Sequence, residues 1–231
     1  MRLPILPALK TPPTGLGIAP SLPHLTHLTQ SSAPSAPFAP SESFLPIIPI
    51  FTSMQRIMII GCGGSGKSTI AKQLQHLLKL ELIHLDAHFF TGNWVEIDRD
   101  EWQTLNQTLV KKQAWIMDGN YGSTMHMRID RADTIIFMDF PTTVRLWRVF
   151  WRTFRNHGTA RPDMPPECRE RFSWQFFHYI LMYNPTRRKG ILKKLDAVRP
   201  EKRIEILRNN RQVKAFLHAV AVKRVQNPPE L

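Results

Sequence analysis

The chain of 231 residues is predicted to fold as an α/β protein with a parallel, doubly wound sheet. Two observations predict this class: short apolar runs alternate with helical patterns, and a glycine-rich loop joins the first run to the first helix. The predicted strands are Ile57–Ile60, Leu82–Leu85, Ala114–Met117, Thr134–Met138 and Arg203–Leu207. Helices are expected at 70–78, 99–112, 142–155, 168–196 in pieces, and 210–220.

The first 53 residues are expected to lie outside the folded domain. They hold 11 of the 19 prolines, and proline at this density removes backbone donors and breaks helices. This segment is predicted to be a disordered extension or an over-long start, with a targeting segment as the alternative. The folded domain is predicted at 54–222, with a lid region at about 150–190 and a C-terminal tail at 223–231.

The net charge of +13 is confined to one part of the chain. Residues 145–231 hold 20 basic and 7 acidic residues, whereas the rest of the chain is close to neutral. No stretch approaches the roughly 18 apolar residues that a membrane span needs. Two cysteines cannot form a disulfide framework, and no cysteine or histidine cluster has zinc spacing. A cytoplasmic protein without a membrane contact or structural metal is therefore expected.

A glycine-rich segment, Gly61-Cys-Gly-Gly-Ser-Gly-Lys-Ser68, follows the first predicted strand and opens the first predicted helix. It satisfies the G-x-x-x-x-G-K-[ST] pattern of a P-loop, in which glycines let successive backbone N–H groups converge on phosphate oxygens. Lys67 is expected to neutralise charge on the β- and γ-phosphates of ATP, and Ser68 to bind Mg²⁺. Cys62 is expected to be a small filler. The nucleotide is expected to contact Gly61, Gly63, Gly64, Ser65, Gly66, Lys67, Ser68 and Thr69.

Three acidic residues follow predicted strands, and the carboxyl ends of parallel strands are where open α/β sheets bind ligands. Asp118 is expected to hold Mg²⁺ through water, because the glycine that follows it permits a sharp turn. Asp86 is expected to act as a base or to contact the hydroxyl group of the phosphoryl acceptor. Asp139 fits a turn or helix-start role equally well. His84 and His88, on either side of Asp86, are expected to pack rather than to catalyse.

The predicted helix at 142–155 carries two rows of side chains. Its arginines recur every three or four residues, which places them on one stripe, and its apolar residues are expected to form the adjacent stripe. The arginines are Arg145, Arg148, Arg152 and Arg155, and the apolar residues are Val144, Trp147, Trp151 and Phe154. Arginines in one row repel one another, and guanidinium groups bind phosphate oxygens in a bidentate manner. The row is therefore expected to meet a triphosphate.

Within this row, Arg148 and Arg152 are predicted to be catalytic and Arg155 to bind the nucleotide. A solvated basic face or a nucleic-acid contact is the alternative. The stretch 156–166 is rich in glycine and proline, and it is expected to be a mobile loop that acts as a lid. The aromatic residues at 172–183 are expected to pack, with base stacking as the minor alternative.

From Met54 to about Leu217 the chain resembles the adenylate-kinase-related P-loop proteins known as DNA topology modulation, or FlaR-type, proteins. The resemblance lies in Gly61–Ser68, His84–Asp86, Trp115–Tyr121, the helix with Arg148 and Arg152, and Arg203–Leu217. It implies a three-layer P-loop NTPase fold, similar to that of nucleoside monophosphate kinases, with a helical, arginine-bearing lid. It also implies a five-stranded parallel sheet in which the third strand lies between the first and the second.

The same resemblance implies residue roles. Asp118-Gly119 matches the Asp-Gly after the third strand of nucleoside monophosphate kinases, and Arg148 and Arg152 match their paired arginines at the start of the lid. One departure is clear: Asn120-Tyr121-Gly122 stands where adenylate kinase continues with Phe-Pro-Arg. The arginine that grips the monophosphate is missing at that position, which argues against adenylate kinase activity proper.

The leading hypothesis is a kinase that uses ATP and Mg²⁺ to phosphorylate a small acceptor, such as a nucleoside, a nucleotide or another hydroxyl metabolite. In it, Lys67, Arg148 and Arg152 stabilise the transferring phosphoryl group, and Asp86 orients the acceptor hydroxyl. The alternative is a nucleotide-dependent DNA-binding regulator with ATPase activity alone, which binds nucleic acid through the basic C-terminal region. No helix-turn-helix, zinc or RNA-binding motif supports that alternative.

Overall fold

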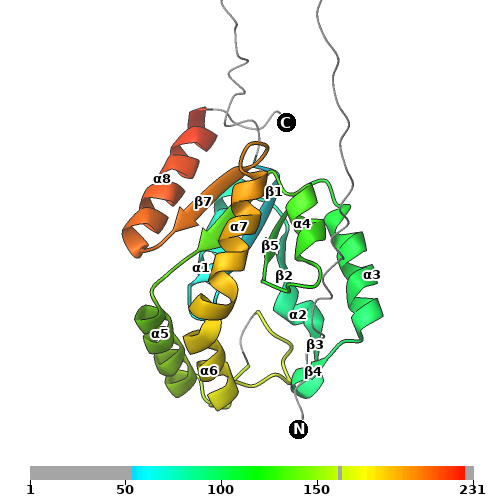
Figure 1. Cartoon of the computed structure of the whole chain (residues 1–231), viewed down its shortest axis with the longest axis vertical. Helices are drawn as coiled ribbons and strands as arrows, with labels where there is room; N and C mark the ends of the chain where they lie inside the picture. Colours follow the sequence, from blue (N-terminus) through cyan, green and yellow to red (C-terminus); the bar gives the residue numbers. More distant parts are fainter. Residues whose placement is uncertain (1–53, 161–162, 227–231) are drawn as a thin grey trace, which may run out of the picture. The chain divides into compact units, whose positions relative to one another are not determined.

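A five-stranded parallel sheet lies at the centre of residues 54–160 and 163–226, the part of the chain that the computed structural model describes (Figure 1). Its strands are β1 (Arg56–Gly61), β2 (Leu82–His84), β5 (Trp115–Asp118), β6 (Thr134–Met138) and β7 (Arg203–Leu207). The strand order is β2-β5-β1-β6-β7, and every neighbouring pair is parallel. The predicted strands and the position of the third strand between the first and second are confirmed.

Helices cover both faces of the sheet, which makes three layers. On one face lie α1 (Lys67–Leu78) and α8 (Asn210–Gln226). On the other lie α3 (Arg99–Val110), α4 (Met125–Arg131), α6 (Trp174–Tyr183) and α7 (Lys189–Val198). Side chains of β1 alternate between the two faces: Ile57 and Ile59 pack with α1 and α8, and Met58 and Ile60 pack with the other layer. The structure therefore confirms the predicted three-layer P-loop NTPase fold.

Three short elements are absent from the sequence prediction. They are α2 (Leu85–Phe89), α4, and a hairpin formed by β3 (Phe90–Thr91) and β4 (Val95–Glu96) around the 3₁₀ turn η1 (Gly92–Trp94). Asn93 and Trp94 in this turn have φ values of 59° and 63°, a conformation that non-glycine residues rarely adopt. Such short elements hold too few residues to show a periodic pattern.

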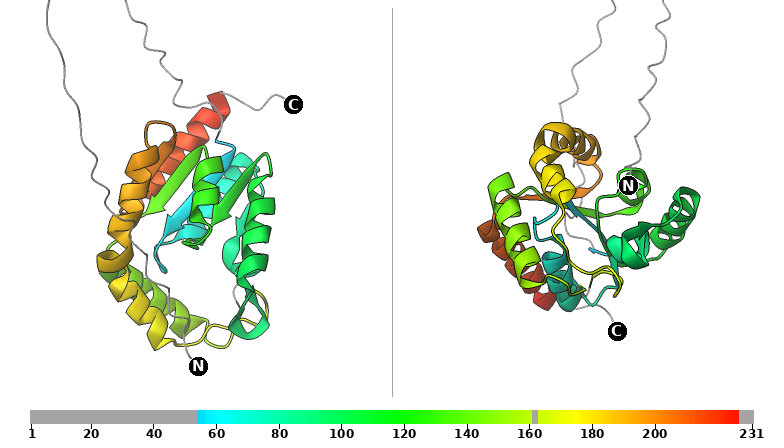
Figure 2. Two further views of the ribbon diagram at one scale, coloured as in Figure 1. Left: turned by 45° about the vertical axis from the view of Figure 1, so that its right-hand side comes forward. Right: turned by 90° about the horizontal axis from the view of Figure 1, so that it is seen from below.

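The region after β6 contains the predicted helical lid. Helix α5 (Thr142–Arg155) has the predicted bounds, and α6 continues through the π-helical turn η2 (Asn184–Arg188) into α7. Between α5 and α6, residues 156–160 and 163–173 form what we call the lid segment. It contains one antiparallel bridge, between Ala160 and Arg169, and it crosses from α5 and α6 to the β3–β4 hairpin (Figure 2).

Two further expectations concern the ends of the chain. Residues 1–53, for which an extension was expected, lie outside the described residues, as do residues 227–231 of the expected tail. Helix α8 runs to Gln226, beyond the domain boundary expected at 222. Within residues 54–160 and 163–226, no helix has the length and apolar character that crossing a bilayer would require.

Candidate functional site

The loop between β1 and α1 is shaped by its glycines. Gly61 has a φ of 148°, and a Cβ atom at this position would lie 2.6 Å from the carbonyl oxygen of Met138. Gly66, with a φ of 96°, is the N-cap of α1, and the backbone N–H of Ser65 donates to the carbonyl oxygen of Cys62 over 3.2 Å. A glycine loop that opens onto a helix N-terminus presents backbone N–H groups and the positive end of the helix dipole to an anion.

Lys67 spans this loop from the first residue of α1. Its Nζ atom donates to the carbonyl oxygen of Cys62 over 3.3 Å, so its charge lies against the loop backbone. Cys62 itself is fully buried, and burial raises the pKa of its thiol. A buried thiol with a raised pKa is poorly reactive, as expected for a small filler.

The hydroxyl of Ser68 lies beside the end of β5. Ser68 Oγ donates to Asp118 Oδ2 over 2.7 Å, and Asp163 Oδ2 of the lid segment lies 3.0 Å from the same hydroxyl. His84 Nδ1 lies 3.2 Å from Asp118 Oδ2 and orients that carboxylate. Asp118 Oδ1 is buried and has no hydrogen-bond partner among the described residues. The predicted pair of Ser68 and Asp118 is thus brought together.

The donor atoms at this site fit a magnesium ion. No group of three or more His, Cys, Asp or Glu side chains within residues 54–160 and 163–226 is arranged to hold a metal. Mg²⁺ nevertheless needs few protein ligands, because it keeps several of its water molecules. One hydroxyl and one or two carboxylates are therefore sufficient. The unpartnered Oδ1 atom of Asp118 provides one such ligand atom.

Asn120 ties the end of β5 to the phosphate loop. Its Oδ1 atom accepts from the N–H of Gly61 over 2.8 Å, and its Nδ2 atom donates to the carbonyl oxygen of Gly61 over 2.7 Å. The buried Arg128 donates to the carbonyl oxygens of Gly119, Asn120 and Tyr121 over 2.6, 2.7 and 3.0 Å. These bonds fix the Asp-Gly-Asn-Tyr turn, and with it the position of Asp118 relative to the loop.

Asp86 lies in the first turn of α2 rather than directly at the end of β2, because β2 ends at His84. The hydroxyl of Tyr121 donates to Asp86 Oδ1 over 2.5 Å. Burial, followed by the nearby charge of Asp86, raises the pKa of Tyr121, so the phenol stays protonated and remains a donor. One oxygen of Asp86 is therefore held in place from the Asp-Gly-Asn-Tyr turn.

Asp139, the third strand-end carboxylate, has a structural role. Arg188 Nε and Nη2 donate to its two oxygens over 2.8 and 2.7 Å, and Arg208 Nε lies 3.6 Å from Oδ2. The bidentate pair joins the end of β6 to η2. The side chain of Asp139 thus forms ion pairs rather than starting α5, whose N-cap is Pro141.

The arginine row on α5 is divided among different surroundings, which corrects the expectation of one stripe facing phosphate. Arg145 is buried: its Nη2 atom donates to Thr142 Oγ1 over 2.6 Å and to Asn184 Oδ1 over 2.9 Å. Arg148 reaches the phosphate loop, where Nη1 donates to the carbonyl oxygen of Ser65 over 3.1 Å. Its Nη2 atom donates to Asn210 Oδ1 at the start of α8 over 2.8 Å.

The outer two arginines of the row have different neighbours. Arg152 Nε forms an ion pair of 3.0 Å with the buried Glu170 of the lid segment. The guanidinium of Arg155 lies 5.7 Å from the centre of the Trp151 ring, at the exposed end of α5. Arg148 is thus the member of the row whose guanidinium donates to the backbone of the phosphate loop, and the nucleotide contact predicted for Arg155 stays a prediction.

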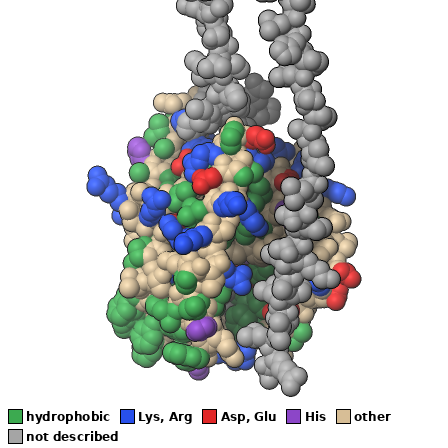
Figure 3. Space-filling view, viewed as in Figure 1, with side chains coloured by type: hydrophobic (Ala, Val, Ile, Leu, Met, Phe, Trp, Pro, Cys, Tyr) green, Lys and Arg blue, Asp and Glu red, His purple; other side chains and the backbone are tan. Residues whose placement is uncertain are grey.

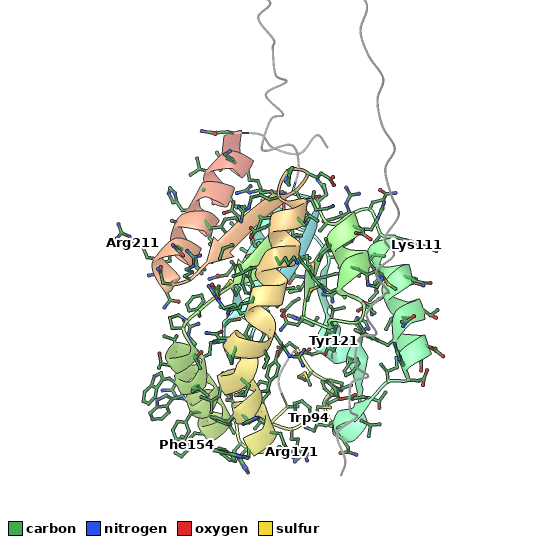
Figure 4. All side chains as sticks on the ribbon, in the orientation of Figure 1. Trp94, Lys111, Tyr121, Phe154, Arg171 and Arg211 are labelled. Atoms are coloured by element: carbon green, nitrogen blue, oxygen red, sulfur yellow. The ribbon has the colours of Figure 1, made fainter. Side chains whose placement is uncertain are left out.

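The expected apolar stripe of α5 is exposed at its three aromatic residues, Trp147, Trp151 and Phe154, whereas Val144 packs against the core that α1 shares with the sheet. Trp147 is 61% exposed and Phe154 is 69% exposed, and Phe154 lies on the outer side of the helix (Figure 4). Arg145, Val149 and Thr153 face inward instead. The aromatic residues after the lid segment are mixed: Phe176 packs on the phosphate loop, whereas Trp174 is 68% exposed.

Sequence reasoning missed three residues of this site. Asp163 was within the predicted lid loop, but no local pattern relates it to Ser68, 95 positions earlier. The Asp-Gly-Asn-Tyr motif drew attention to Asn120, but its bonds to Gly61 depend on β1 and β5 lying side by side. Nothing in the sequence of α4 distinguishes Arg128 from a surface arginine.

No protein-family model and no curated protein sequence matches the chain. Among solved structures, the chain is similar to shikimate kinase from Acinetobacter baumannii in complex with shikimate. The sequence identity is 15% and the TM-score is 0.47, and the match covers 77% of this chain and 97% of that chain. It is also similar to deoxyadenosine kinase from M. mycoides, with 15% identity, coverage of 74% and 98%, and a TM-score of 0.40.

A sugar kinase from Janibacter sp. HTCC2649 is similar at 14% identity, with coverage of 75% of this chain and 94% of that chain and a TM-score of 0.40. All three structures are of kinases. At identities and TM-scores this low, the likenesses concern the fold and say nothing of the substrate of this chain.

Proposed function

We propose that the chain is a kinase that transfers the γ-phosphoryl group of ATP to a hydroxyl group of a small acceptor. The observation that carries the proposal is the contact of 2.7 Å between the phosphate-loop Ser68 and the buried Asp118. A glycine loop alone binds phosphate, but a hydroxyl paired with a carboxylate at the mouth of the loop supplies ligands for the ion that accompanies ATP.

In this proposal the chain's own residues position and neutralise the triphosphate. The loop N–H groups bind phosphate oxygens, and Lys67 moves from the Cys62 carbonyl onto the β- and γ-phosphates. Ser68 and Asp118 would hold Mg²⁺, which neutralises charge on the phosphate oxygens when it is bound. Arg148, already at the loop backbone, adds positive charge where the phosphoryl group is transferred.

We assign the acceptor to the side of the sheet where Asp86 lies. Tyr121 holds Asp86 Oδ1, and no other described residue hydrogen-bonds to the Asp86 side chain, which leaves Oδ2 for an acceptor hydroxyl. A positioned carboxylate accepts the hydroxyl proton as the oxygen attacks phosphorus. Arg152 would contribute to catalysis only after leaving Glu170, a separation that movement of the lid segment would bring about.

The resemblance to FlaR-type proteins supports membership of that adenylate-kinase-related family and a cytoplasmic location as parts of the same proposal. It also keeps the alternative of a DNA-binding regulator with ATPase activity alone. The observation that favours this alternative is the exposed aromatic and arginine side chains along one side of α5, since such side chains stack on bases and bind phosphates.

The test is phosphoryl transfer from γ-³²P-labelled ATP to a panel of nucleosides, nucleotides and sugar or cyclitol alcohols. Lys67→Ala is expected to reduce transfer to an active acceptor by about 100-fold or more, because a charge on the transferring group is lost. Lys72→Ala is the matched control, because Lys72 is exposed on the same helix, and it should leave the rate within about twofold.

One outcome would overturn the proposal. ATP hydrolysis that no acceptor accelerates and that DNA stimulates would identify the regulator instead. Salt-sensitive DNA binding that survives excess ATP would strengthen that conclusion, because the basic surface would then serve nucleic acid rather than the nucleotide.

A further inference from the structure

Two carboxylates converge on the hydroxyl of Ser68. Its Oγ atom lies 2.7 Å from Asp118 Oδ2 and 3.0 Å from Asp163 Oδ2, and a hydroxyl donates its single proton to one of them at a time. Both aspartates are buried, with 5% and 8% exposure. Like charges this close repel each other strongly where water is scarce, and a cation between them would remove the repulsion.

Other polar groups of the site lie beside Asp118 and along the phosphate loop. His84 Nδ1 lies 3.2 Å from Asp118 Oδ2, on the β2 side of the site. Lys67 donates to the carbonyl oxygen of Cys62. Asp118 Oδ1, in addition, is a buried acceptor without a hydrogen-bond partner among the described residues. The oxygen atoms of Ser68, Asp118 and Asp163 therefore form a set of hard ligands around one point.

We propose that Asp163 is a second carboxylate of the metal site, so that the Mg²⁺ of the nucleotide complex is held from two sides. Ser68 and Asp118 hold it from the sheet, and Asp163 holds it from the lid segment, directly or through water. This inference rests on the proposed function, because the ion arrives with ATP. It adds to that function a residue that no part of the P-loop motif predicts.

The contacts of the lid segment imply that metal binding through Asp163 also affects the position of this segment. On the far side of Asp163 the segment is bound to the β3–β4 hairpin: Trp94 Nε1 donates to the carbonyl oxygen of Arg169 over 3.1 Å, and the Trp94 N–H donates to Cys168 Sγ over 3.4 Å. Figure 4 shows Trp94 beside the segment. Metal binding through Asp163 thus holds the lid segment between the phosphate loop and the hairpin, so metal affinity and lid closure are coupled.

The experiment measures metal binding rather than activity. Mn²⁺ is titrated by electron paramagnetic resonance into the full-length chain saturated with a non-hydrolysable ATP analogue. Asp163→Asn keeps the shape of the side chain and removes its charge, and it is expected to weaken Mn²⁺ binding by about tenfold or more. Glu167→Gln is the control: Glu167 is an exposed carboxylate on the same segment, and its loss should change the affinity less than twofold.

Limited trypsin digestion provides a second readout. Bound Mn²⁺ is expected to slow cleavage after Arg169 and Arg171 in the wild type and to leave cleavage of Asp163→Asn unchanged, because the lid segment is then no longer held. Both arginines are exposed on the described part of that segment, which makes them accessible before the metal binds.

The outcomes separate this inference from the proposed function. If Asp118→Asn loses Mn²⁺ while Asp163→Asn binds it as the wild type does, or more tightly, the role of Asp163 is overturned and the kinase proposal stands. If Mn²⁺ binding depends on Asp163 but no acceptor is ever phosphorylated, the kinase proposal alone fails. If the wild type binds no Mn²⁺ in the presence of the nucleotide, both fail.

Discussion

Helices α1 and α5 both follow a strand of the central sheet and both carry apolar residues at helical spacing, yet they differ in how many of those residues they bury. Helix α1 buries Ile70, Ala71 and Leu74 against the sheet and α8. Helix α5 buries Arg145, Val149 and Thr153, and it exposes its aromatic residues. Periodicity therefore identifies which residues share a helix face, but it does not identify which face is covered.

The reason lies in what each helix meets. Helix α1 lies across the apolar face of β1, β5 and β2, so its apolar side faces inward. Helix α5 instead meets the phosphate loop, where a Cβ atom on Gly64 would lie 2.5 Å from the carbonyl oxygen of Arg145 and 2.8 Å from Val149 Cγ2. Such a close approach of backbones leaves no room for indole rings. The aromatic residues consequently gather on the outer surface, where Figure 3 shows hydrophobic side chains over α5.

Among substitutions that test this comparison, the largest change in the free energy of unfolding is expected on α1. Leu74 is fully buried, and Leu74→Ala should lower the free energy of unfolding by about 2–4 kcal/mol, because it removes apolar contacts and leaves a cavity. Urea unfolding measures the change. Lys72→Ala, on the exposed side of the same helix, should stay within about 0.5 kcal/mol. A loss below 1 kcal/mol for Leu74→Ala would show that the α1 face is not a packed core.

A smaller effect is expected within the arginine row of α5. Arg145→Ala should cost about 1–3 kcal/mol in urea unfolding, because Thr142 and Asn184 lose a buried donor. Arg155→Ala is the matched control, since Arg155 is exposed, and it should change stability by less than about 0.5 kcal/mol. Equal effects of the two substitutions would contradict the division of the row into buried and exposed members.

The smallest effect is expected on the outer face of α5. Phe154→Ser should change the free energy of unfolding by less than about 0.5 kcal/mol, because the ring is already 69% exposed. The same urea experiment measures it, and Trp147→Ser should behave alike. A loss above 1 kcal/mol at either position would mean that this face is covered in solution, and sedimentation would then tell whether a second copy covers it.

Much of the fold was predictable because its determinants are local. Each strand of the central sheet is a short apolar run. The phosphate loop is recognisable from its glycines, of which Gly64 and Gly66 adopt positive φ values. The pair of Ser68 and Asp118 was predictable for a related reason. Parallel strands end at one edge of the sheet, so a carboxylate at the end of β5 reaches the loop after β1.

The roles of the remaining carboxylates depend on distant partners. Asp118 and Asp139 both directly follow apolar runs, yet Ser68 lies opposite one and Arg188 opposite the other. No local sequence pattern indicates which side chain will lie opposite each carboxylate. The hairpin at 90–96 escaped prediction because strands of two residues have no measurable period.

The sequence by itself determined the five strands of the central sheet, the phosphate loop and the bounds of α5, because backbone preferences and apolar periodicity act over a few neighbouring residues. Only the tertiary structure decided that α5 turns its aromatic side outward, that Arg145 is buried, and that Asp163 meets Ser68. Those outcomes depend on close packing between segments far apart in the chain, where the space left by one segment selects the side chain of another.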